Sequence, residues 1–289
     1  MADSDYQIVV ASADDIKWIL KMANIEGHNI GCNDAVAYHQ ADPTGFFVGL
    51  LNGQPVSCAS GVKYQNFAFG GLYVVAKEHR GKGYGVKIFH YVLDSVKDYT
   101  FGIDSVIEQQ SNYEMAGFKF AHKNTRYSGV ISKSEATCHN IVEAKSISFA
   151  KLMEYDTRHF PGVRKYFLSS WINVATDRSV VYLDADKKIQ GFAAIRKSYD
   201  GYKVGPLFAE RVEFAEALLH ALVDSLGECI KVIIDIPNPN NNAKKLIDKY
   251  NLEFNLETAR MYLGPRGARW EIPDIDLDTV YGLTSLELG

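Results

Sequence analysis

Six consecutive residues, three of them glycine, limit how this chain can fold more than any other segment; they read Arg80-Gly81-Lys82-Gly83-Tyr84-Gly85. A strand-like run, residues 70–75, precedes them, and a helix-like run, residues 86–93, follows them. Glycine permits positive φ and a close approach of backbone N–H groups to a phosphate, and a helix N-terminus adds positive potential. The segment is therefore predicted to be a strand–turn–helix unit that binds a pyrophosphate.

A glycine-rich segment such as residues 80–85 has several other possible interpretations. A Walker loop requires G-x-x-x-x-G-K-[ST], which the sequence lacks. A dinucleotide fingerprint requires G-x-G-x-x-G, whereas the glycines here fall at 81, 83 and 85, and no acidic residue clearly ends the next strand to hold a ribose. A surface turn that binds nothing is the remaining alternative, and the flanking strand and helix argue against it.

The spacing Arg80-x-x-Gly83-x-Gly85 resembles the R/Q-x-x-G-x-G/A signature of the GNAT-type N-acetyltransferase superfamily, which binds the pyrophosphate of acetyl-CoA. The resemblance implies that residues 80–85, among them Gly81, Lys82 and Tyr84, hold the pyrophosphate of acetyl-CoA or coenzyme A. It also implies that Leu72, Tyr73 and Val74 bind the pantetheine arm through backbone hydrogen bonds, as an added strand would.

A second match lies downstream, where Tyr113 stands four residues before Gly117-Phe118. GNAT proteins often carry Y-x-x-x-G-F there, and the resemblance implies that Tyr113 protonates the departing thiolate as general acid. The alternative is a tyrosine that is simply packed between helix and sheet. Many family members have an asparagine seven residues earlier, where this chain has Val106; Asn112 is the candidate to replace it near the cofactor.

In GNAT folds the segment between the first two helices borders the acceptor site, and here that segment is polar and glycine-rich, residues 26–34. The acceptor amine must lose a proton, so Glu26, His28 and Glu108 are candidate bases, with Glu26 preferred. Glu26, His28 and Asn29 are the predicted acceptor-binding residues. Each of the three candidate bases could instead be a solvated or capping residue.

Composition excludes other classes of function. The net charge of −4 argues against a general nucleic-acid binder, and no apolar run reaches the ~18 residues that span a bilayer. The N-terminus is acidic and lacks a secretory signal, so a cytoplasmic protein is expected. The cysteines at 32, 58, 138 and 229 form no C-x-x-C pair, so neither a metal site nor a disulfide framework is predicted.

The order of elements predicts an α/β fold, an α+β mixed sheet in a tandem GNAT-like acyl-CoA N-acyltransferase arrangement. Expected in the first half are a helix at 13–23, a hairpin of strands 45–51 and 54–63, and strands at 67–75, 105–107 and 119–130, the last closing the sheet. We predict an acetyltransferase domain at 1–130 and a degenerate GNAT-like domain at 131–289. The second half has Glu210-Arg211 where glycines would be needed, and Ile247 at the position of the acid.

The expected function is transfer of an acetyl group from acetyl-CoA to an amine by direct attack in a ternary complex. The acceptor could be a small amine or a peptide or protein amine, with no nucleic acid, membrane or metal involved. Two alternatives stay open: a non-catalytic regulatory protein that binds coenzyme A or acetyl-CoA, and a transferase of longer acyl chains.

Overall fold

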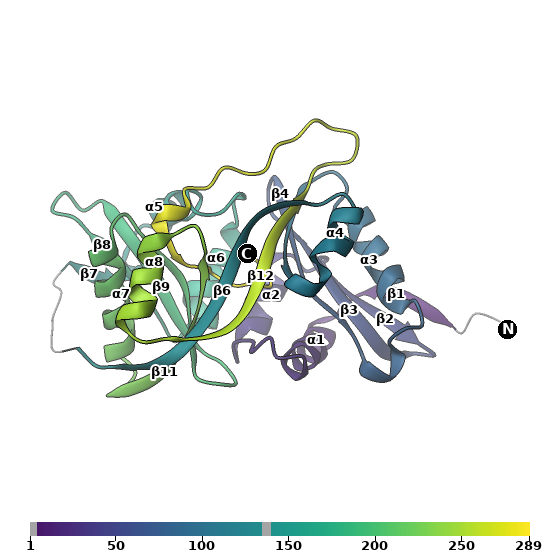
Figure 1. Ribbon diagram of the computed structural model, residues 1–289, viewed down its shortest axis with the longest axis horizontal. Helices are drawn as coiled ribbons and strands as arrows, with labels where there is room; N and C mark the ends of the chain where they lie inside the picture. The colour runs from purple at the N-terminus through teal and green to yellow at the C-terminus, as the bar shows by residue number, and fades with distance from the viewer. Residues whose placement is uncertain (1–4, 135–139) are drawn as a thin grey trace.

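The computed structural model describes residues 5–134 and 140–289, and within them thirteen strands form one mixed sheet. The sheet is continuous through both halves of the molecule, and β6 and β12 run side by side through its middle (Figure 1). Adjacent strands are antiparallel except for β4 with β5 and β10 with β11, which are parallel.

The two halves repeat one order of elements. The first half contains β1 (Tyr6–Val10), α1 (Ala13–Ile25), α2 (Asp34–Ala41), β2 (Phe46–Leu51), β3 (Gln54–Lys63), β4 (Phe67–Val75), α3 (Tyr84–Ser95), β5 (Thr100–Val106), α4 (Gln110–Met115) and β6 (Lys119–Ser132). The second contains β7 (Ile141–Glu143), α5 (Phe149–Asp156), α6 (Lys165–Ser170), β8 (Arg178–Leu183), β9 (Ile189–Lys197), β10 (Tyr202–Ala209), α7 (Val212–Asp224), β11 (Cys229–Pro237), α8 (Asn241–Lys249), β12 (Glu253–Leu263) and β13 (Val280–Gly282).

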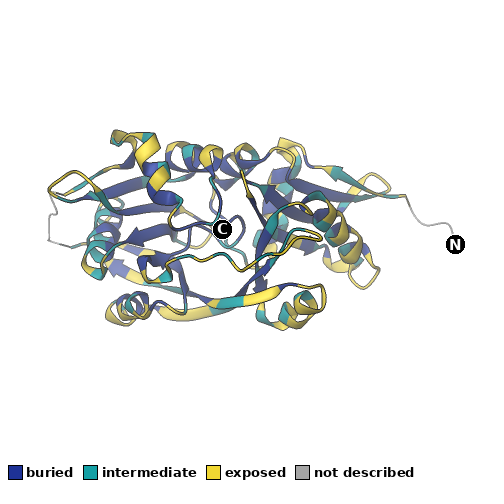
Figure 2. Cartoon of the chain, turned by 90° about the horizontal axis from the view of Figure 1, so that it is seen from above, coloured by how far each residue is buried: buried dark blue, intermediate teal, exposed yellow. Residues whose placement is uncertain are grey.

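Helices cover both faces of each half of the sheet, and period-2 alternation of the strands supplies the cores. In β2, Phe46 and Val48 pack in the core that holds α1 and α2, while Phe47 packs in the core that holds α3. In the second half α7 and α8 cover one face, and α5 and α6 cover the other. Figure 2 shows buried segments running through the interior of both halves.

The halves exchange their last long strands. β12 comes from the second half but pairs with β5 of the first half, and β6 from the first half pairs with β11 of the second. The expectation that strand 119–130 closes the first sheet directly is therefore wrong, because β12 lies between β5 and β6. The physical reason is burial, since Ala259 and Met261 of β12 pack into the first-half core with Phe101 and Phe118.

Local signals predicted the other elements of the first half well, with one exception. Ser12 caps α1 through a capping box with Asp15, as its side chain and position indicated. The hairpin turns at Asn52-Gly53, both with positive φ. The strand expected at 105–107 is longer and earlier, because β5 begins at Thr100 and its apolar residues Phe101 and Ile103 enter the core. The predicted division at 130/131 falls within β6.

Candidate functional site

The glycine turn between β4 and α3 has the backbone of an anion site. Gly81 and Gly83 have φ of 76° and 84°, and a methyl group built on either would meet nothing within 4 Å. Gly83 is the N-cap of α3, a twelve-residue helix, so free N–H groups and the positive end of its dipole meet at the turn. Gly85 is needed for another reason, because a Cβ there would lie 2.6 Å from the Tyr73 hydroxyl oxygen.

Two hydrogen bonds of Arg80 order the turn. Its Nε donates to the carbonyl oxygen of Val75 at 2.9 Å, and its Nη2 donates to Oε1 of Glu26 at 2.5 Å. Lys82 is held separately, with Nζ 2.9 Å from the carbonyl oxygen of Glu78. Glu26, expected as the base, is therefore bonded to the arginine of the turn.

A cleft opens where β4 and β5 part. The two parallel strands pair from Phe67 to Gly70 on β4, and beyond that point no further pairing joins them in the described structure. Leu72 has φ of 52°, an irregularity that shifts the register of β4 against β3. The cleft has a volume of about 530 Å³, within the usual range for a small-molecule site. Leu72, Tyr73 and Val74 all line it.

Tyr113 of α4 lines the same cleft and is half-buried among aromatic rings. Its ring meets Phe89 edge-on at 5.6 Å and Phe118 at 5.4 Å between centroids. Burial, with a smaller contribution from Tyr73, raises the pKa of the Tyr113 phenol above its ordinary value. The phenol is therefore protonated near neutral pH and able to donate a proton.

Not every predicted residue reaches the cleft. Asn112 is exposed and donates to Oε1 of Gln109 at 2.7 Å, and it is Gln109 that lines the cleft. Asn29 instead contacts the second half, where its Oδ1 accepts a hydrogen bond from the backbone nitrogen of Asp200 at 3.0 Å. Glu108 is exposed and outside the cleft lining. Glu26 and His28 do line it.

Sequence reasoning missed the residues that the second half and the exchanged strands bring to the cleft. Leu256 and Thr258 come from β12, Arg126 comes from β6, and Leu286 and Glu287 come from the segment that follows β13. We call residues 283–289 the C-terminal segment. Its only local signal was one carboxylate between two leucines, Leu286 and Leu288.

The C-terminal segment packs against equivalent strands of both halves. A Cβ on Gly205 of β10 would lie 2.3 Å from the carbonyl oxygen of Leu283, and a Cβ on Gly71 of β4 would lie 2.4 Å from that of Glu287. Tyr64 anchors the end of the segment by donating to the carbonyl oxygen of Leu288 at 2.9 Å. Leu286 and Glu287 of the segment thereby line the cleft of the first half. The chain ends near the middle of the molecule (Figure 2, where C marks the end).

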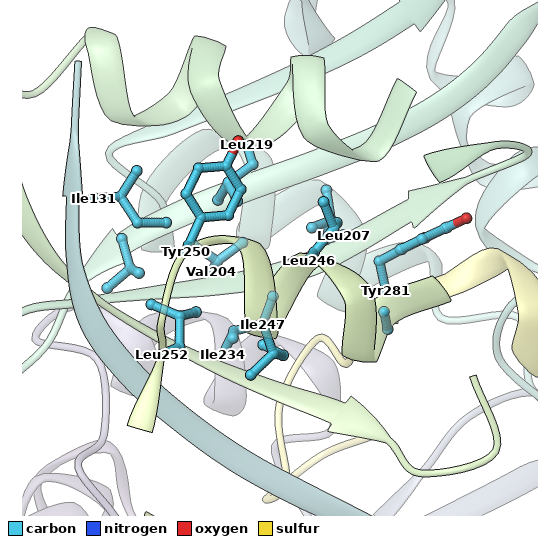
Figure 3. Close-up of a pocket in the computed structure, with 12 residues that line it drawn as sticks. Ile131, Val204, Leu207, Leu219, Ile234, Leu246, Ile247, Tyr250, Leu252 and Tyr281 are labelled. Atoms are coloured by element: carbon cyan, nitrogen blue, oxygen red, sulfur yellow. The ribbon is translucent and has the colours of Figure 1, made fainter. Parts of the chain in front are cut away.

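The equivalent opening in the second half is filled. β10 and β11 pair from Tyr202 to Val204 on β10, and farther along β13 pairs with β10 at Leu207 and Phe208. The apolar pocket beside it has a volume of only about 10 Å³. Figure 3 shows its lining side chains, among them Ile247, the residue that the sequence pattern places where the first half has Tyr113. A site of this size holds no cofactor.

Two other kinds of feature are absent from the described residues, namely metal-binding clusters and membrane-spanning helices. Among the described residues no three or more His, Cys, Asp or Glu side chains gather where they could hold a metal ion. Nor does any helix within residues 5–134 and 140–289 have the length and apolar character to cross a membrane. Cys32, Cys58 and Cys229 are free, and Cys138 lies outside the described residues.

Each half of the chain matches a family model of GNAT acetyltransferases. Residues 13–118 match the family model described as the acetyltransferase (GNAT) family, and residues 152–273 match the one described as the acetyltransferase (GNAT) domain. The holothin acyltransferase of Pseudoalteromonas sp. (strain SANK 73390) is 27% identical over 282 residues, which cover 96% of this chain and 93% of that protein.

Solved structures show the same fold. A protein of Pyrococcus horikoshii provisionally described as an acetyltransferase superposes with a TM-score of 0.81 at 22% identity, covering 100% of this chain and 98% of its own. A tandem GNAT protein from the clavulanic acid biosynthesis pathway superposes with a TM-score of 0.60 at 12% identity, covering 92% and 100%. With two matching domains in one chain and a tandem fold, this chain belongs to the GNAT superfamily of acyltransferases.

Proposed function

We propose that this chain is an acetyl-CoA-dependent N-acetyltransferase with one active site, in the first half. The observation that carries the proposal is the cleft between β4 and β5, about 530 Å³ in volume, with the glycine turn and Tyr113 beside it. A phosphate-binding turn, an exposed strand edge and a proton donor are the three features that a CoA thioester needs from a protein.

The cofactor would lie along β4. The backbone of Leu72, Tyr73 and Val74 lies beyond the last pairing with β5, so its hydrogen-bonding groups can receive the amides of the pantetheine arm as an added strand. Residues 80–85 would receive the pyrophosphate. In this proposal Glu26 also helps to bind the pyrophosphate, because its hydrogen bond from Arg80 orders the turn and occupies Oε1 of its carboxylate.

The chemistry is a direct transfer in a ternary complex. The acceptor nitrogen attacks the thioester carbonyl, a C–N bond forms, and the C–S bond breaks with its electron pair leaving on sulfur. Tyr113 donates its proton to that sulfur, and its raised pKa keeps the proton available at neutral pH. CoA therefore leaves as the thiol. The acceptor nitrogen releases one proton to a base or to solvent, and the phenolate regains one from solvent.

A small-molecule amine is the acceptor that we propose. A relative similar along almost its whole length is named a holothin acyltransferase, which makes a small-molecule acceptor reasonable for this chain. The cleft lining also includes apolar side chains, among them Leu256 and Leu286, that suit the body of such a molecule. Peptide N-termini and lysine side chains are the alternatives to be assayed.

Residues 1–130 form the catalytic unit in this proposal and residues 131–289 the degenerate unit, but neither completes its sheet alone. β12 supplies the neighbour of β5, and β6 supplies the neighbour of β11. The catalytic unit expressed without residues 131–289 should therefore expose the edge of β5 and fail to give a soluble folded protein.

Release of free thiol from acetyl-CoA, followed with a panel of small amines, amino acids, peptides and lysine derivatives, tests the proposal. Acetylated product from at least one small amine, confirmed by mass spectrometry, is the expected result. Binding of acetyl-CoA without transfer to any amine would favour the regulatory alternative. Faster transfer from a longer acyl-CoA would show that the longer acyl group, not acetyl, is the group that the enzyme prefers to donate.

A further inference from the structure

The acceptor side of the cleft contains a buried carboxylate that the proposed function leaves without a role. Glu287 is only 2% exposed, yet it lines the cleft and its Oε1 has no hydrogen-bond partner among the described residues. A buried polar atom without a partner is costly, so such an atom at a site wall indicates a working group. Glu287 reaches the site from the C-terminal segment.

His28 lines the cleft beside this carboxylate. Its Nδ1 lies 3.8 Å from Oε1 of Glu287, and its side chain is 33% exposed. The carbonyl oxygen of His28 accepts from Nη1 of Arg126 at 2.9 Å, which fixes the turn after α1. With Nδ1 facing Glu287, Nε2 is the ring nitrogen left for an acceptor. A carboxylate behind an imidazole holds the ring and stabilises its protonated form.

The buried charges around Glu287 balance without His28. Three carboxylates and three cations form a connected cluster across the two halves: Asp34 with Arg196, Asp235 with Arg126, and Glu287 with Lys203, whose Nζ is 3.9 Å from Glu287 and 4.0 Å from Asp235. The Tyr38 hydroxyl adds a hydrogen bond to Oε2 of Glu287 at 3.3 Å. The imidazole is therefore not needed as a fixed counter-ion and can accept a proton during turnover.

The pKa shifts of Glu287 and Lys203 are consistent with a Glu287 that stays ionised beside His28. Burial alone would raise the pKa of Glu287, but Lys203, then His28 and Arg126, hold it well below its ordinary range. Burial, with Arg126 next, lowers the pKa of Lys203 to about 8. Glu287 therefore remains an anion near neutral pH, which makes it a poor base by itself and a good partner for an imidazolium.

We propose that His28 is the general base of the transfer and that Glu287, supplied by the second half, is its positioning residue. The inference rests on the proposed function. His28 takes the proton from the acceptor nitrogen as the C–N bond forms, while Tyr113 gives its proton to the sulfur as the C–S bond breaks. Solvent then removes the proton from the imidazolium and restores the phenol, so the degenerate half completes the active site of the other.

The first test is a His28→Gln variant, with His90→Gln as its control, because His90 is exposed on α3 and outside the cleft lining. His28→Gln should lower kcat about 10²-fold at neutral pH while the Kd for acetyl-CoA stays unchanged. The loss should shrink as pH rises, since the acceptor amine then arrives deprotonated. Full kcat in His28→Gln, with acetyl transfer intact in the parent protein, would overturn the inference but leave the proposed function standing.

The second test separates positioning from packing. Glu287→Gln keeps the shape of the side chain but removes the negative charge that favours the imidazolium. The pKa read from the acid limb of kcat/KM should therefore fall, and that limb should move to lower pH, with kcat about tenfold lower. The control is Glu143→Gln on β7, which should not move the limb. If Glu287→Gln loses activity with the limb unmoved, Glu287 has only a structural role.

Discussion

A Tyr113→Phe substitution removes one oxygen atom from the cleft and leaves the packing intact. The phenyl ring keeps its edge-on contacts with Phe89 and Phe118, and no hydrogen bond joins the Tyr113 hydroxyl to another described residue. The melting temperature should therefore change little, and the Kd for acetyl-CoA should be unaffected. Removing the proton donor should lower kcat about 10²-fold, equal to ~2.7 kcal/mol of transition-state stabilisation.

The assay is thiol release at saturating acceptor, with the Kd for acetyl-CoA and thermal unfolding measured on the same preparations. Tyr91→Phe is a matched control, because Tyr91 also packs edge-on against a phenylalanine, Phe47, at 5.1 Å, but lies outside the cleft lining. Tyr91→Phe should retain full kcat. If Tyr113→Phe also turns over at the parental rate, the assignment of Tyr113 as the acid is refuted.

Three further perturbations have separable outcomes. Gly83→Ala and Gly53→Ala both place a methyl group at a positive φ with nothing within 4 Å, so each should lower the free energy of unfolding by ~1–2 kcal/mol. Only Gly83→Ala should also weaken CoA binding, at least tenfold, as measured by calorimetry. Glu26→Gln should raise the KM for acetyl-CoA severalfold with kcat nearly unchanged, and a large loss of kcat would restore Glu26 as the base. Asp34→Asn leaves the buried Arg196 uncompensated and should lower the melting temperature by about 10 °C, whereas a shift under 2 °C would contradict a role for this pair in joining the halves.

The elements that the sequence predicts well are those whose signals are local. Glycines with required positive φ mark the turn at residues 80–85, a capping box marks the start of α1, and Asn52-Gly53 marks a hairpin. The features that the sequence does not reveal depend on contacts between distant residues. The pairing of β12 with β5 joins residues such as Thr258 and Val106, and no pattern within either strand specifies that partner.

The same limit applies to the site. The proposed cofactor side has a signal in the sequence, because the turn and Tyr113 belong to short motifs. The acceptor side could not, because Glu287 reaches the cleft only after the C-terminal segment has crossed from β10 to β4. The missing glycines of the second half predict that it is idle, and the structure adds an observation that supports this prediction: β13 pairs with β10 beyond the point where β10 and β11 separate.

Calorimetric titration of the full chain with acetyl-CoA and with CoA tests the central claim most directly. The open cleft of about 530 Å³ in the first half and the pocket of about 10 Å³ in the second predict one site per chain, weakened by Gly83→Ala and unaffected by Gly53→Ala. Two equivalent sites, or a single site that Gly83→Ala leaves intact, would contradict the account, and so would no binding of either ligand.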